Sequence, residues 1–148
     1  MTMSTEVILT YDKLFTMLEA LDKIEETTVE FKNISATTSL FKAKQEIDVH
    51  VKAFRLKNKP SVEYQKCITE ANHVKRTLEG DELKTKLKEI DKKNSELFKK
   101  EEERRIHIEE ELQKEVTIFV DLINIKDLTS KTVKDMAFVF AIGPLIKT

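Results

Sequence analysis

The sequence is poor in the residues from which several common kinds of functional site are built. Its 148 residues include two glycines, two prolines, one cysteine and no tryptophan. Gly80 and Gly143 are too far apart to form a phosphate-binding loop, because such loops need several glycines within about eight residues. A single cysteine, Cys67, excludes a disulfide framework and any zinc site made of cysteines.

Long apolar runs are also missing. The longest covers residues 137–146, and this is about half of what a membrane span requires. The first residues show no basic region leading into an apolar stretch, so we predict no secretory signal. An unpaired cysteine is compatible with a reducing compartment. We therefore expect a soluble protein of the cytoplasm with no membrane contact.

Charge, by contrast, is abundant. Charged residues make up 36% of the chain, where roughly 25% is usual, and this composition favours long helices that face water. The overall net charge of -1 gives no general attraction to nucleic acid or to anionic membranes. Residues 1–31 nevertheless carry seven acids against two bases, and residues 32–59 carry seven bases against two acids. We expect the first two helices to lie beside each other for this reason.

Apolar residues recur at helical spacing through most of the first 115 residues. Helices are predicted over residues 10–26, 35–58 and 60–80, beginning at Thr10, Ser35 and Pro60 or Ser61, and Asp81 is the expected N-cap of the next. That last helix, over residues 82–113, has a heptad-like seam with one polar member, Asn94. Residues 99–105 are polar on every face, and this is typical of a stalk that projects into solvent.

The period changes to two after Glu115, and this predicts a small β element near residues 116–125. A lone strand cannot satisfy its own backbone. It must therefore pair with residues 6–9 or 27–31, or with another subunit. A short apolar helix, capped by Thr129 or Ser130, follows and is stopped by Gly143.

Together these patterns predict a mainly α fold. We expect a single domain, in which residues 1–80 form a helical hairpin or bundle and residues 81–115 form one long projecting charged helix. Residues 116–148 would add the strand and the short apolar helix.

A search for chemistry finds no catalytic or metal-binding constellation. Glu70 and His73 reproduce the Glu-x-x-His spacing of di-iron bundles, but the chain has no second such pair. We therefore expect no metal, no cofactor, no small-molecule substrate and no enzymatic activity.

The apolar run near the C-terminus exceeds what one face of a short helix needs. It either covers the core or forms an interface with another subunit or partner, because exposed apolar surface usually marks an interaction site. The expected interface residues, from the strand and this run, are Val116, Ile118, Val120, Phe138, Phe140, Ile142 and Leu145.

The basic helix at residues 42–59 supports an alternative function. Its last part contains four bases and no acid, and these are Lys52, Arg55, Lys57 and Lys59. They could contact nucleic acid or an acidic partner, although an ordinary solvated face explains them better. Nucleic acid is not the favoured partner.

The last forty residues contain Glu109-Glu-Glu-Leu-Gln-Lys-Glu-Val-Thr-Ile-Phe-Val and close with Gly143-Pro-Leu-Ile-Lys-Thr148. Most strongly over these residues, the order of elements resembles that of small helical accessory proteins of bacteriophage genomes. Residues 137–142 are more aromatic and apolar than the closing helix of that group. The resemblance implies a viral protein of the host cytoplasm without catalytic residues. We predict an interaction protein that assembles into homo-oligomers or binds and blocks a host protein.

Overall fold

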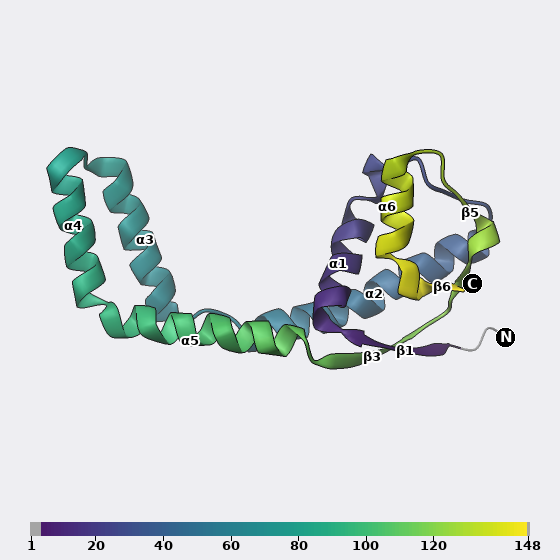
Figure 1. Ribbon diagram of the computed structural model, residues 1–148, viewed down its shortest axis with the longest axis horizontal. Coiled ribbons are helices and arrows are strands. Elements are labelled where there is room, and N and C mark those ends of the chain that lie inside the picture. Colours follow the sequence, from purple (N-terminus) through teal and green to yellow (C-terminus); the bar gives the residue numbers. More distant parts are fainter. Residues whose placement is uncertain (1–3, 148) are drawn as a thin grey trace. The chain divides into compact units, whose positions relative to one another are not determined.

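A computed structural model describes residues 4–147 (Figure 1). It is 71% helical, with six α-helices and a few short strands in small sheets, so the predicted mainly α fold is confirmed. The chain divides into two compact units, Met1–Arg55 with Glu111–Thr148, and Leu56–Glu110. Each unit buries an apolar cluster of its own, and the single domain stays a prediction.

The first unit contains every strand described within residues 4–147. Its elements are β1 (Thr5–Thr10), α1 (Tyr11–Asp22), β2 (Glu30–Phe31), most of α2 (Ile34–Lys57), β3 (Glu115–Val120), β4 (Ile123–Asn124), β5 (Leu128–Thr129), α6 (Val133–Ala141) and β6 (Ile146–Lys147). The second unit contains α3 (Val62–Thr77), α4 (Gly80–Lys93) and most of α5 (Ser95–Leu112). Short 3-10 turns cover Ile24–Glu26, Ile125–Asp127 and Gly143–Leu145.

The strand predicted near residue 116 finds its partner within the chain. β1 and β3 pair antiparallel, with Val7 opposite Ile118 and Leu9 opposite Val116. The short strands β2 and β5 pair antiparallel, and β4 and β6 pair parallel. Residues 6–9, one of the predicted candidates, therefore satisfy the backbone of β3.

α1 and α2 lie against each other in the first unit, as the opposite charges of their sequences predict. The Nζ of Lys44 lies 3.1 Å from a carboxylate oxygen of Asp22. The rings of Tyr11 and Phe15 pack on Phe54, with centroids 4.9 and 5.3 Å away. Below them is an apolar core whose fully buried members include Leu14, Met17, Ile47, Val51, Ile118 and Ile123.

The second unit contains a helical hairpin. α3 and α4 lie side by side (Figure 1) and bury a small cluster around Cys67, Val74 and Ile90. The chain reverses at Gly80, whose φ of 63° lies in the left-handed region that residues with a Cβ avoid.

Side-chain caps begin α1, α2, α3 and α6, and not always at the predicted residue. Thr10 and Ser61 accept hydrogen bonds from backbone N–H groups of α1 and α3, as expected. Ser35 does not cap α2, because the Asn33 side chain accepts the N–H of Ala36 at 2.8 Å. Other predicted caps are also wrong, since α6 begins after Thr132 rather than Thr129 or Ser130, and α4 begins after Glu79, which places Asp81 in its first turn.

The long helix predicted over residues 82–113 is broken at Asn94, so that part of the prediction is wrong. The backbone of Asn94 leaves the helical region, with φ of -112° and ψ of 22°. Its side-chain Nδ2 donates to the carbonyl oxygen of Ile90 at 2.9 Å, and the same oxygen also accepts the backbone N–H of Asn94 at 3.0 Å. Two helices, α4 and α5, result.

The polar stretch at residues 99–105 is not solvated on every face. Glu101 is buried, and its carboxylate accepts hydrogen bonds from Nε and Nη2 of Arg104 at 2.8 and 2.5 Å. Arg104 also donates to the backbone carbonyl of Asn58 at 2.5 Å. These hydrogen bonds lower the pKa of Glu101 and raise that of Arg104. The pair attaches α5 to the segment before α3.

Candidate protein-interaction surface

The structure places most of the predicted interface residues in the core of the first unit. The buried ones are Val116, Ile118, Val120, Phe138, Ile142 and Leu145. The interface prediction is wrong for these residues, because side chains packed inside the chain cannot touch a partner. On β3 the predicted residues share the face turned to the core, while the alternate residue Phe119 is exposed.

Phe140 is the exception, because its side chain is exposed. It belongs to an apolar surface that includes other exposed residues of α6. Its side chain is 79% exposed, and those of Val133 and Met136 are 85% and 55% exposed. These residues are three and seven positions apart, so they share one side of the helix with Ala137. We call Val133, Met136, Ala137 and Phe140 the α6 face.

The opposite side of α6 is held in place by the buried carboxylate of Asp135. Asp135 and Thr132 form a capping box at the start of the helix. The carboxylate also accepts the backbone N–H groups of Lys131 and Thr28 at 2.9 and 2.8 Å, and the Thr28 hydroxyl. This network connects α6 to the segment before β2, so the α6 face is carried on a fixed helix.

The same hydrogen bonds determine the ionisation of Asp135. The Thr28 hydroxyl and the Lys131 backbone N–H favour the charged form and hold the pKa of this carboxyl well below its usual range. Asp135 is therefore a charged residue with a structural role, and its carboxylate oxygens already accept hydrogen bonds from Thr28 and Lys131.

A hollow of about 180 Å³ lies beside the α6 face, between α6 and the end of α1. Small side chains leave this space, since Ala20, Ala137 and Ala141 are among the residues that line it. Charged groups complete the lining, namely Lys23, Glu26 and Lys134. The hollow gives the otherwise flat α6 face a recess with a polar rim.

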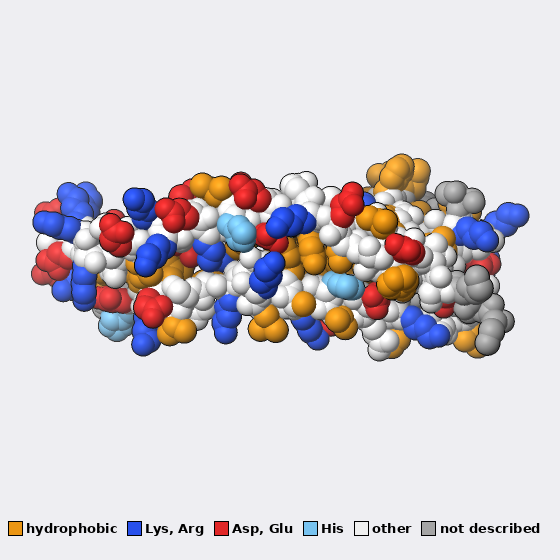
Figure 2. All heavy atoms as spheres, turned by 90° about the horizontal axis from the view of Figure 1, so that it is seen from below, with side chains coloured by type: hydrophobic (Ala, Val, Ile, Leu, Met, Phe, Trp, Pro, Cys, Tyr) orange, Lys and Arg blue, Asp and Glu red, His pale blue; other side chains and the backbone are white. Residues whose placement is uncertain are grey.

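Three of the four bases of the predicted nucleic-acid contact have partners within the chain. Lys52 forms an ion pair with Asp48 at 2.8 Å, and the Arg55 guanidinium lies 5.4 Å from the centre of the Phe15 ring. Lys57 also has a partner, and both Lys57 and Lys59 belong to the second unit. Acidic and basic side chains alternate over the surface seen in Figure 2, which shows no continuous basic stripe.

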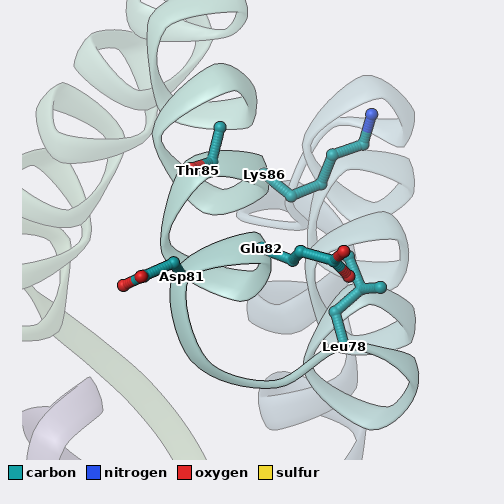
Figure 3. Close-up of a pocket in the computed structure, with 5 residues that line it drawn as sticks. All are labelled: Leu78, Asp81, Glu82, Thr85 and Lys86. Atoms are coloured by element: carbon teal, nitrogen blue, oxygen red, sulfur yellow. The ribbon is translucent and has the colours of Figure 1, made fainter.

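A hollow of about 490 Å³ lies at the turn between α3 and α4 and is lined by Leu78, Asp81, Glu82, Thr85 and Lys86. The two acids do not converge there, because Asp81 points away from Glu82 (Figure 3). The two carboxylates therefore do not form a close pair in this hollow.

Metal-binding geometry is likewise not found within residues 4–147. No three His, Cys, Asp or Glu side chains of that range are grouped closely enough to hold an ion. His50 instead forms a local pair with Glu46 at 3.1 Å.

None of the helices over residues 4–147 combines the length and the apolar character that crossing a membrane demands.

A second exposed apolar stripe was missed by the sequence reasoning. It lies on the side of α2 that faces away from the core and includes Ile34, Phe41, Val49 and Leu56, all strongly exposed. Their spacing of seven and eight residues is the signal that could have revealed it.

Comparisons with protein-family models, with curated proteins and with solved structures found no match. The resemblance to phage accessory proteins stays a prediction.

Proposed function

We propose that this protein acts without catalysis, by binding another protein through the α6 face. The observation that supports this most strongly is the exposure of three large apolar side chains, Val133, Met136 and Phe140, on one side of a nine-residue helix. Exposing such side chains to water is unfavourable, and contiguous apolar patches on soluble proteins mark interaction sites.

The chemistry of the face indicates what kind of partner it fits. Phe140 and Met136 supply an aromatic and a flexible thioether, both of which are enriched where proteins meet. The adjoining hollow between α1 and α6 can receive one apolar side chain of the partner, while its rim offers Lys23, Glu26 and Lys134 for polar contacts. The partner is therefore expected to present an apolar residue surrounded by charges. Binding of this kind serves an assembly component and a blocking protein alike.

A comparison of two exposed phenylalanines tests the proposal. The tagged chain is immobilised, and the proteins that it retains from a lysate of its source cells are quantified for wild type, Phe140→Ser and Phe119→Ser. Phe140→Ser is expected to lower retention of the partner at least about 30-fold, because central aromatic anchors contribute 2 kcal/mol or more. Phe119→Ser is the matched control, since Phe119 is 57% exposed but lies on β3.

The result that would overturn the proposal is equal retention of the same proteins by wild type and Phe140→Ser. Circular dichroism at 222 nm keeps the comparison interpretable, because removing an exposed side chain should leave the helical signal unchanged. Retention that disappears on nuclease treatment and weakens with salt would instead favour the nucleic-acid alternative.

A further inference from the structure

α2 has apolar residues on two opposite sides. One side is buried in the first unit and carries Leu40, Ala43, Ile47 and Val51. The other side is exposed, and it carries Ile34, Phe41, Val49 and Leu56, which we call the α2 face. A helix that only covers a core needs one apolar side and places polar residues on the other. The α2 face is therefore in excess of what the fold requires.

The α2 face is symmetric along the helix. Three exposed polar residues lie between the apolar ones on this side of α2. Together the apolar and polar residues form a line of positions along the helix, namely 34, 38, 41, 45, 49, 52 and 56. The steps are 4, 3, 4 and then 4, 3, 4, so Gln45 lies at the midpoint. An eleven-residue repeat corresponds to three helical turns, which keeps this line nearly parallel to the helix axis over about 33 Å.

Such symmetry suits a second copy of the same surface. In an antiparallel pair of helices related by a two-fold axis through Gln45, Phe41 meets Val49 of the other copy, and Ile34 meets Leu56 of the other copy. No large apolar side chain is left opposite a gap. A parallel pair would instead place the three polar positions, Thr38, Gln45 and Lys52, against their own copies, so that lysine faces lysine.

The charges beside the α2 face also fit the antiparallel arrangement. Lys42 and Glu46 lie along one flank of the line, and Lys44 and Asp48 lie along the other. In the antiparallel dimer each flank lies beside the same flank of the other copy, which runs in the opposite direction. Lys42 therefore comes near Glu46 of the other copy, and Lys44 comes near Asp48 of the other copy. In the single chain Lys44, Glu46 and Asp48 form ion pairs at 3.1, 3.1 and 2.8 Å, all partly exposed and able to be shared.

From the symmetric spacing and the flanking charges we propose that two copies of this chain associate through the α2 face, with their α2 helices antiparallel and Gln45 on the two-fold axis. The interface is continuous over the six turns of the line and involves no residue of the α6 face. We expect it to lie at the lower end of specific interfaces, near 1,000 Å² of buried surface in order of magnitude, with micromolar affinity. The exposed ion pairs contribute little to that affinity and mainly select orientation.

Cysteine cross-linking distinguishes the possible arrangements. Position 38 lies opposite position 52 of the other copy in the antiparallel dimer, whereas the two copies of position 38 are fourteen residues apart, about 21 Å along the axis. A disulfide needs Cα atoms within about 7 Å. Thr38→Cys and Lys52→Cys chains are oxidised separately and as an equal mixture. We expect a disulfide-linked dimer from the mixture and none from either chain alone.

Each other outcome overturns the proposal. Linked dimers from Thr38→Cys alone would show parallel helices, and no linked dimer from any sample would show that the α2 face does not bind its own copy. The wild-type chain is the background control, because Cys67 is buried and burial raises the pKa of its thiol, which makes it poorly reactive.

Two further variants connect the cross-link to the α2 face. Val49→Ser, added to both cysteine chains, is expected to lower the yield of the mixed dimer at least about 10-fold. Phe140→Ser, added in the same way, is expected to leave it unchanged, and a loss there would contradict the proposal. Because Phe140→Ser tests the α6 face and Val49→Ser tests the α2 face, failure of either proposal is recognised separately.

Discussion

Phe138 and Phe140 are two residues apart on α6, and their environments differ almost completely. Phe138 is 4% exposed and belongs to the core of the first unit, whereas Phe140 is 79% exposed. Phe138→Ala removes a ring that the surrounding side chains cannot replace, and such changes lower the free energy of unfolding by about 3–5 kcal/mol. Phe140→Ala removes a ring that contacts mainly water, so the expected change is within about 0.5 kcal/mol.

Urea unfolding followed by circular dichroism at 222 nm measures both effects. We expect the midpoint of Phe138→Ala to fall clearly, with a decrease in Tm on the order of 10 °C, while Phe140→Ala overlays the wild type. The pair is matched in residue type, helix and substitution, so only burial differs. Equal loss of stability in both variants, or none in Phe138→Ala, would refute the assignment of one face of α6 to the core and the other to solvent.

Three further predictions concern single contacts. Gly80→Ala is expected to lower the free energy of unfolding by about 1–2 kcal/mol in urea titrations, because a Cβ is strained at a φ of 63°. Asp135→Asn is expected to lower the Tm, since an amide nitrogen would face backbone donors. The pKa of Asp135 is lower in the folded chain, so its stabilisation is complete above the unfolded pKa of about 4 and is lost as the pH falls below it. Wild-type Tm should therefore fall more steeply than that of Asp135→Asn in acid, and parallel curves would argue against this role. Glu101→Gln is expected to lower stability by about 1–2 kcal/mol, because Arg104 loses its charged partner but keeps some contact with water; an unchanged urea midpoint would contradict it.

The elements that depend on local pattern were predictable from the sequence. Thr10 and Ser61 are caps because their hydroxyls precede helical periodicity, and the structure has both. The alternation of Val116, Ile118 and Val120 defines a strand with one buried side. Each of these signals lies within a few neighbouring residues.

What depends on distant contacts was not predictable. Periodicity continues through Asn94, and nothing local shows that its backbone leaves the helical region. Asp135 could not be recognised as buried, because its donor Thr28 is 107 residues away.

The candidate surfaces were only partly predictable for a related reason. An apolar run such as residues 137–146 contains enough side chains for two faces of α6, and the sequence does not show which face is inside. α2 presents the same ambiguity with its two stripes. Only packing separates Phe138 from Phe140, and Ile47 from Val49.

Site-specific photo-cross-linking from position 140 tests the central claim most directly. A photoreactive phenylalanine analogue replaces Phe140 in the full chain, the source cells are irradiated, and the adducts are identified by mass spectrometry, with the analogue at Phe41 as the matched control. Binding through the α6 face predicts one dominant adduct with another protein from position 140, which position 41 does not give. No adduct from position 140, or the same adducts from both positions, would contradict the claim.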